Sequence, residues 1–245
     1  DKQGFMWFGT QDGLNKFDGI NFKVYKHDPS DQNSLSDNFI YDIEEDKKGN
    51  LWIGTRSGGL SYYDIELDKF RTYKHENNNP NSISHDLVND IALDAQGNLW
   101  IGNYGGLNHL NVESGVFQSF HNDENNSNSL SNDEINCIFI DSEGFIWIGT
   151  MNGLNKLDPN SKTFTHYFNE KGNDNSISSD VIRSIWEDQL GNIWIGTIGG
   201  GLNKFDKNTA KFVSYRHDDT DQESISNNDV LVIKPAPDNK IWIGT

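Results

Sequence analysis

The sequence is poor in cysteine and proline, and it has no long apolar run. Its single cysteine, Cys137, excludes an internal disulfide, but it leaves the compartment open because secreted proteins of this size can lack disulfides. No apolar stretch approaches the roughly 20 residues that a membrane-spanning helix needs. No signal peptide is visible, but the chain starts and stops inside a repeat. We therefore interpret it as a piece of something longer, for which missing targeting signals mean little.

Positive charge is also scarce. The chain has 20 lysines and arginines against 37 acidic residues, which gives a formal net charge of −17. A surface this acidic repels phosphate backbones and anionic lipids, so nucleic acid and the membrane surface are excluded as partners. Apolar residues make up only 34% of the chain, while aromatic residues make up 12%. This combination is typical of short strands that bury large rings between polar turns.

What the sequence does contain is a repeat. A Trp-[Ile/Phe]-Gly-[Thr/Asn] unit recurs at intervals of 45 to 48 residues, at Trp7, Trp52, Trp100, Trp147, Trp194 and Trp242. A period of about 40–50 residues rich in short strands is the signature of a β-propeller blade. The five nearly equal periods leave no room for another domain. The sequence therefore predicts an all-β fold, a β-propeller of four-stranded antiparallel blades.

One repeat divides into four short strands. Residues 39–45, 51–55, 60–64 and 70–73 are expected to form them, because Gly, Asn or Asp stands in every connection. The turn at 46–50 has the pattern Asp-x-x-Gly, in which Asp accepts backbone N–H groups and Gly takes a positive φ without strain. We expect this aspartate to cap its own hairpin, since the loop lacks the ligand density of a calcium site.

The period also predicts the blade boundaries. A partial blade is expected at residues 1–38 and another at residues 229–245. The complete blades expected between them are 39–86, 87–133, 134–180 and 181–228. About five periods are thus present. Because open blade edges present unpaired backbone groups, self-association through these edges is an expected interaction.

Several of these segments resemble a known family. Residues 46–55 read Asp-Lys-Lys-Gly-Asn-Leu-Trp-Ile-Gly-Thr, and residues 59–64 read Gly-Leu-Ser-Tyr-Tyr-Asp. Both are similar to the two-component regulator propeller repeat. The linking stretches 25–29 and 33–36 resemble the same family, and related segments return in every copy.

The resemblance implies both a fold and a function. Members of this family build seven-bladed propellers, which form the periplasmic sensor region of hybrid two-component histidine kinases and sometimes of diguanylate cyclases. Many members from gut Bacteroidetes sense glycan fragments and switch on polysaccharide-utilisation genes. By resemblance, the chain is an incomplete piece of a seven-bladed propeller in the periplasm. It would reach the membrane only through flanking segments and would bind an oligosaccharide.

The repeated Trp and the glycine that follows are interpreted as framework, so binding residues are sought where the copies differ. Two positions differ: the residue after the Trp strand and the residue at the start of the first strand, which a propeller places on one face. Aromatic rings stack on sugars, amides pair with hydroxyl groups, and Arg pairs with carboxylate or sulfate. The predicted ligand-binding residues are Tyr41, Arg56, Asn89, Tyr104, Asn136 and Arg183. The alternative, that they are only solvated turn residues, stays open.

Three functions remain open from the sequence. The first is a non-enzymatic ligand-sensing propeller, and the second is a scaffold that binds a partner or its own copy. The third is a propeller lyase with His85 as its base. No catalytic or phosphate-binding motif is present, which favours a chain that is not an enzyme and has no cofactor. No metal site is expected, because His27, His75 and His217 fall in different blades.

Overall fold

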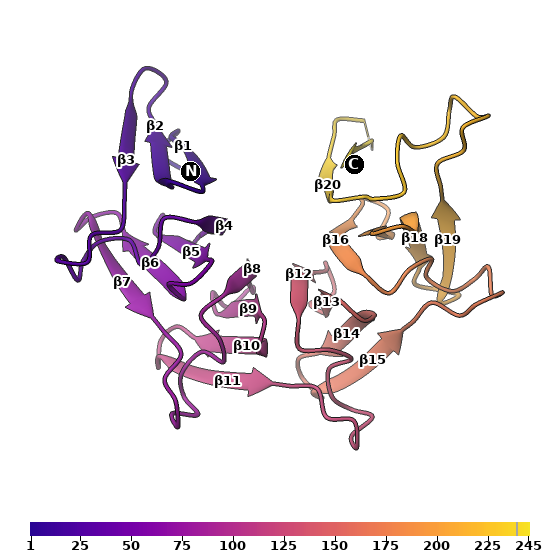
Figure 1. Cartoon of the computed structure of the whole chain (residues 1–245), viewed down its shortest axis with the longest axis horizontal. Coiled ribbons are helices and arrows are strands. Elements are labelled where there is room, and N and C mark those ends of the chain that lie inside the picture. Colours follow the sequence, from indigo (N-terminus) through magenta and orange to yellow (C-terminus); the bar gives the residue numbers. More distant parts are fainter. Residues whose placement is uncertain (239) are drawn as a thin grey trace. The chain divides into compact units, whose positions relative to one another are not determined.

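The computed structural model describes residues 1–238 and 240–245, which divide into two compact units. The first unit is Asp1–Phe120 and the second is His121–Thr245. Each unit is a series of small antiparallel sheets (Figure 1). Over the described ranges there is no helix, and hence none that is long and apolar enough to cross a membrane.

The first unit holds three sheets whose strands follow chain order. The first sheet has three strands: β1 (Met6–Thr10), β2 (Gly13–Phe17) and β3 (Phe22–Tyr25). The second has four: β4 (Ile40–Glu45), β5 (Leu51–Thr55), β6 (Leu60–Asp64) and β7 (Lys69–Tyr73). The third also has four: β8 (Val88–Leu93), β9 (Leu99–Asn103), β10 (Gly106–Asn111) and β11 (Val116–Phe120). The second sheet confirms the strands expected for one repeat, to within about one residue at each end.

The second unit continues the same pattern. Its first sheet has four strands: β12 (Ile135–Ile140), β13 (Ile146–Thr150), β14 (Leu154–Asp158) and β15 (Thr163–Tyr167). The next has four: β16 (Ile182–Glu187), β17 (Ile193–Thr197), β18 (Gly201–Asp206) and β19 (Lys211–Tyr215). The last has two: β20 (Val232–Pro235) and β21 (Ile241–Gly244). These meanders are the blades of an all-β propeller, as predicted, and the propeller that they form is incomplete.

The turn between the first two strands of a blade is capped by its aspartate. Asp46 Oδ1 accepts two backbone N–H groups of its own turn, at 2.8 and 2.9 Å. In the second unit, Asp141 makes the same cap and also accepts the indole Nε1–H of Trp147 at 2.9 Å. The expected hairpin cap is confirmed, and in this blade the same carboxylate also fixes the orientation of the repeated Trp.

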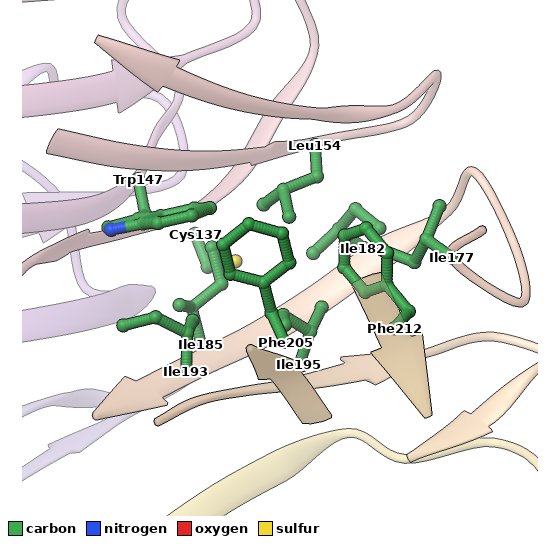
Figure 2. Packing of buried hydrophobic residues seen from close by; sticks show 10 residues of the cluster. All are labelled: Cys137, Trp147, Leu154, Ile177, Ile182, Ile185, Ile193, Ile195, Phe205 and Phe212. Carbon is green, nitrogen blue, oxygen red and sulfur yellow. The ribbon is translucent and has the colours of Figure 1, made fainter. Parts of the chain in front are cut away.

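The repeated Trp packs between neighbouring blades. Trp147 on β13 is 0% exposed, and its ring centroid lies 5.4 Å from that of Phe205 on β18 (Figure 2). Trp52 and Trp100 are buried in the first unit as well. Trp242 departs from the prediction, because it lies on β21 and is 69% exposed. The Trp becomes core only where a following blade covers it, and the described residues supply no blade after β21.

The glycine two residues after the Trp allows the next blade to approach. A Cβ added to Gly54 would lie 2.9 Å from Val88 Cγ1 at the start of β8. At Gly149 in the second unit, it would lie 2.6 Å from Ile182 Cγ2 at the start of β16. Any side chain at these positions would push the innermost strand of the next blade outward. The framework interpretation of this glycine is therefore confirmed in both units.

The loop that leads into each blade carries a further framework element, which we call the latch. A latch is an aliphatic residue followed by serine. The latches are Leu35-Ser36, Ile83-Ser84, Leu130-Ser131, Ile177-Ser178 and Ile225-Ser226. In the second unit, the Ser178 N–H donates to Asn203 Oδ1 at 3.0 Å, and Asn203 Nδ2 donates back to Ser178 Oγ at 2.7 Å. Ser131 and Asn155 exchange the same two bonds. The latch thus fixes the loop to the third strand of the blade that follows it.

Replacing Asn203 with alanine should lower the free energy of unfolding by about 1–3 kcal/mol. Asn203 is fully buried, and its loss would leave the Ser178 N–H without an acceptor. Asn15 occupies the same position on β2 but meets no latch serine among the described residues, so Asn15→Ala should change stability by about 0.5 kcal/mol or less. Denaturant titration followed by circular dichroism measures both. Equal losses would show that the amide stabilises its own strand and not the latch.

Candidate functional site

Four of the six predicted binding residues lie at a β-bulge. The register between the first two strands of each complete blade shifts by one residue, for example between Ile40 and Asp42 on β4. The residues skipped by these shifts are Tyr41, Asn89, Asn136 and Arg183. A bulge residue is left out of the ladder, and its side chain is re-aimed relative to the strand. The variable position on the first strand of each complete blade is therefore one that the sheet does not hold in register.

Around Tyr41, the first unit builds a compact aromatic and cationic group. The ring centroid of Tyr41 lies 5.0 Å from that of Phe39, and the guanidinium carbon of Arg56 lies 5.2 Å from the centroid of the Phe39 ring. The Arg56 N–H donates to the Phe39 carbonyl at 3.0 Å, which ties the turn after β5 to the start of β4. Tyr41 and Arg56 are both exposed. Together these residues offer an aromatic face for stacking and a guanidinium for a carboxylate or sulfate.

The next blade of the first unit places a second aromatic ring at the corresponding turn. Tyr104 is exposed and follows β9, with its ring centroid 6.3 Å from that of His85. His85 Nδ1 accepts the backbone N–H of Leu87 at 2.9 Å, which fixes the imidazole in its loop. Asn89 lies half-buried at the bulge of β8. This blade thus offers a ring and an amide.

In the second unit, Asn136 and Arg183 lie next to each other. Arg183 Nη1 donates to Asn136 Oδ1 at 3.3 Å, and Asn136 Nδ2 donates to the Ile182 carbonyl at 2.8 Å. The same Nδ2 also lies 3.4 Å from Met151 Sδ. Asn136 therefore joins two neighbouring inner strands, β12 and β16, and holds the exposed Arg183 in place. Of this pair, Arg183 is the group that can reach a ligand.

The recurring histidines fix the loops that carry the latches, through contacts with latch carbonyl groups. Nδ1 of His27, His75 and His217 each lies within hydrogen-bond distance of the carbonyl of a latch aliphatic residue, at 2.7, 2.9 and 2.7 Å respectively. Asn169 takes this position in another blade and donates to the Ile177 carbonyl at 2.7 Å. Because an amide replaces the imidazole, the position needs a polar group that reaches the latch, not a metal ligand. No group of three or more His, Cys, Asp or Glu suited to a metal occurs among the described residues.

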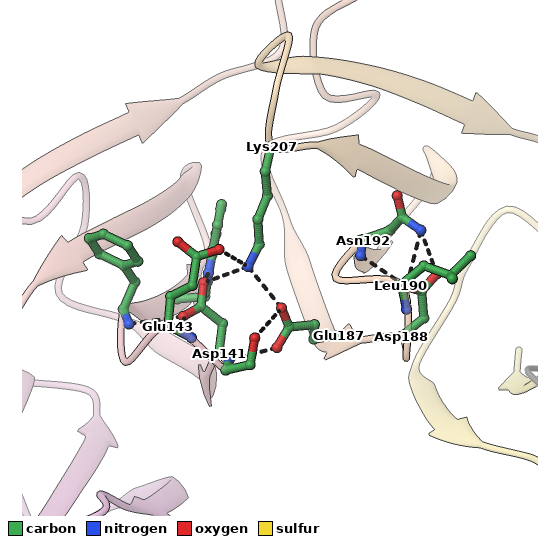
Figure 3. Close-up of polar contacts among 10 residues, drawn as sticks. Asp141, Glu143, Glu187, Asp188, Leu190, Asn192 and Lys207 are labelled. Atoms are coloured by element: carbon green, nitrogen blue, oxygen red, sulfur yellow. Dashed lines mark hydrogen bonds and ion pairs between the residues drawn. The ribbon is translucent and has the colours of Figure 1, made fainter.

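Ion pairs of Lys207 link two neighbouring blades of the second unit (Figure 3). Lys207 Nζ lies 2.8 Å from Glu187, 3.0 Å from Glu143 and 3.2 Å from Asp141. Burial lowers the pKa of Lys207, but hydrogen bonds to Glu187, Glu143 and Asp141 outweigh it and raise that pKa well above its usual value. The lysine is therefore held as a cation between three carboxylates. Because these carboxylates lie in the β12–β13 turn and at the end of β16, Lys207 has a structural role: it joins the two blades.

The sequence pattern misses two contributors to the site. Phe39 is an aromatic residue just before β4, and it carries the stacking contact with Arg56. Phe39 could have been found by asking which residue would lie beside both variable positions of this blade, Tyr41 and Arg56. The bulges leave a trace in the sequence that the pattern reading missed: the apolar residues on either side of each one are three residues apart instead of two, as in Ile40 and Ile43.

The model of the family described as Two component regulator propeller matches three segments of the chain, residues 34–57, 82–105 and 129–152. Each segment runs from a latch, through the bulged strand, to the turn after the Trp strand. The chain is 58% identical to histidine kinase P4 of Formosa agariphila over 36 residues. That match covers 15% of this chain and 3% of the kinase.

Solved structures extend the likeness to the whole chain. The extracellular domain of a hybrid two component system from B. thetaiotaomicron is 27% identical with a TM-score of 0.75, over 100% of this chain and 38% of that chain. Virginiamycin B lyase from Staphylococcus aureus is 12% identical with a TM-score of 0.72, over 99% of this chain and 74% of that chain. At that identity the lyase shows the fold alone. The chain spans well under half of the two-component domain that it resembles.

Proposed function

We propose that this chain, which carries Two component regulator propeller repeats, is the ligand-sensing propeller of an extracytoplasmic two-component sensor. Its ligand is a glycan or oligosaccharide, and the chain itself is not an enzyme. One observation carries the proposal: a bulge in every complete inner strand falls on the residue that varies from blade to blade. Bulges recur next to functional sites because they re-aim a side chain.

The residue types at and beside these bulges indicate an acidic sugar. In the first unit, Arg56 beside Phe39 and Tyr41 combines a cation with aromatic faces. In the second unit, taken by itself, Arg183 is an exposed cation held by Asn136. A stacked aromatic ring recognises the face of a pyranose, while a guanidinium recognises a carboxylate or sulfate in a fork. These exposed cations stand out in a chain whose formal net charge is −17. A neutral oligosaccharide would use the rings and amides alone.

Signalling would follow from a preference of the ligand for one of two conformational states of the sensor. A ligand shifts such an equilibrium only by the difference between its affinities for the two states. The bulge residues lie on the first strands of their blades, and Arg56 and Tyr104 lie on connections beside them, so a bound sugar would bridge neighbouring blades. In the second unit, the Asn136 bond to β16 already links two such strands.

Calorimetric titration with neutral and uronic or sulfated oligosaccharides tests the proposal. Loss of a charged hydrogen bond costs about 1.5–3 kcal/mol, so Arg56→Ala should weaken binding of an acidic glycan about 10- to 100-fold. Tyr41→Ala should weaken both acidic and neutral ligands. Arg71→Ala is the matched control, because Arg71 is an exposed arginine on the outer strand β7 and should leave affinity unchanged. An absence of heat with every oligosaccharide would contradict the proposal.

A further inference from the structure

His85 carries a larger side chain than its place in the fold requires. The residue after each latch serine accepts the backbone N–H two positions further on, which caps the loop that leads into the first strand. Oxygen atoms make this cap after the other four latches, from Asp37, Asn132, Ser179 and Asn227. His85 makes it with Nδ1, which accepts the Leu87 N–H at 2.9 Å. The cap uses one acceptor atom, so the rest of the imidazole is available for another role.

The cap determines which nitrogen of His85 carries the proton. Because Nδ1 accepts the Leu87 N–H, the neutral imidazole has its proton on Nε2. Nε2 is thus a hydrogen-bond donor on an exposed side chain. Within the described residues, neither this N–H nor the Tyr104 hydroxyl forms a hydrogen bond with the protein. A catalytic base needs an unprotonated nitrogen that faces the ligand, so this tautomer does not suit the base of a lyase.

Tyr104 completes a small surface with His85. The centroids of the two rings lie 6.3 Å apart with 36° between their planes, and Tyr104 is 45% exposed. A Cβ added to Gly105 would lie 2.9 Å from the Ser84 carbonyl oxygen, so the glycine lets this turn lie against the loop that carries His85. Two rings, a neutral N–H donor and a hydroxyl suit the apolar face and the hydroxyl groups of a pyranose.

This surface lies next to the Arg56 group, and both belong to the first unit. Arg56 begins the turn at residues 56–59, and the Gly59 N–H of that turn donates to the Asp86 carbonyl at 2.9 Å. Asp86 directly follows His85 in the loop. The turn that carries the cation is therefore bonded to the loop that carries the neutral donor. Two adjoining sugars of one oligosaccharide can contact both groups.

We propose that His85 and Tyr104 form a subsite for a neutral pyranose, in which His85 Nε2–H donates to a sugar hydroxyl. The inference rests on the proposed function and specifies its ligand as a glycan in which a neutral sugar adjoins an acidic one. Arg56 holds the acidic sugar, and the neutral sugar stacks on Tyr104. His85 determines specificity, because a carboxylate or sulfate in this subsite would lose water without meeting a cation.

Calorimetric titration with three matched disaccharides tests the subsite. They are a uronic acid joined to a neutral hexose, a uronic acid joined to a second uronic acid, and two neutral hexoses, each in gluco and galacto configuration. The mixed disaccharide should bind most tightly. His85→Asn should weaken its binding about 2- to 10-fold, the usual effect of losing one neutral hydrogen bond, and should leave binding of the di-uronate unchanged.

Asparagine at position 85 keeps the cap, as Asn132 and Asn227 do after their own latches. The denaturant midpoint of His85→Asn should therefore match that of the unmodified chain, so a change in affinity reports the ligand contact. His75→Asn is the matched control. It makes the same substitution at a histidine that fixes a latch, a role that Asn169 fills in another blade, and it should leave affinity for the mixed disaccharide unchanged.

Three results would overturn the subsite. If the mixed disaccharide and the di-uronate bind equally and His85→Asn affects neither, the subsite is absent, while recognition of an acidic glycan stands. An equal loss of affinity for both ligands in His85→Asn would show that His85 does not distinguish a neutral sugar. If the chain releases heat with no disaccharide and no longer oligosaccharide, the proposed function fails, and the subsite fails with it.

Discussion

Trp147→Ala is expected to lower the free energy of unfolding by about 3–5 kcal/mol, the usual range for removing a buried large aromatic side chain. Trp147 is 0% exposed, and it contacts Tyr167 and Phe205 as well as the aliphatic residues between the two blades. The substitution also removes the indole N–H that donates a hydrogen bond to the buried carboxylate of Asp141. Denaturant titration of the far-ultraviolet circular dichroism measures the loss.

Trp242→Ala is the matched control, because it removes the same side chain from the same four-residue motif. Trp242 is 69% exposed, so its replacement should change stability by about 0.5 kcal/mol or less. The contrast separates the role of the motif from the role of its surroundings. If both substitutions were equally harmful, the Trp would stabilise its own hairpin and not the junction between blades.

Lys207→Met is expected to cost at least about 2 kcal/mol, because it leaves carboxylates that are partly or wholly buried without their cation. Asp141 is buried and Glu187 nearly so, and both carboxylates contact Nζ directly. Methionine keeps the length of the apolar stem, so the loss reports mainly the charge. Lys23→Met is the control. Lys23 pairs with Asp68 where both side chains are more than half exposed, and such pairs contribute about 1 kcal/mol or less.

The Lys207 cluster also predicts a pH dependence with a definite sign. The pKa of Lys207 is raised in the folded chain above its usual 10.5, so the folded state holds this proton more tightly than the unfolded state. The stabilisation is therefore complete below pH 10.5 and is lost as the pH rises through the folded-state value. The stability difference between the unmodified chain and Lys207→Met should be constant near neutral pH and shrink only above pH 10.5. A difference that changed only below about pH 5 would assign the effect to the carboxylates alone.

The strands could be predicted because local chemistry determines them. Asp46 and Gly49 mark a hairpin by their own hydrogen bonds and backbone angle, and the apolar residues on either side define its strands. Burial could not be predicted in the same way. Trp147 and Trp242 share one motif, yet one is core and the other is exposed, because burial depends on whether another blade follows. Lys207 was missed for a related reason: its carboxylates come from other strands, and no spacing rule connects them.

The candidate site was predictable in position but not in geometry. Comparing copies identified Tyr41 and Arg183, because residues without a framework role differ between blades. It did not show that Asn136 is occupied by the Ile182 carbonyl and by Arg183. It also did not show the Phe39 ring that supports Arg56. Such contacts depend on the bulge, which the sequence indicates only by an apolar spacing of three residues instead of two, as between Ile182 and Ile185.

The bulge has an evolutionary consequence. A residue outside the ladder and outside the core can be exchanged with little effect on folding, so its identity is free to follow the ligand. Because each complete blade carries one such residue, the proposed binding site could be changed by single substitutions, one repeat at a time. Asn136 marks the limit of this freedom, since its amide also joins two inner strands. Among relatives of this chain, position 41 should therefore diversify faster than position 136.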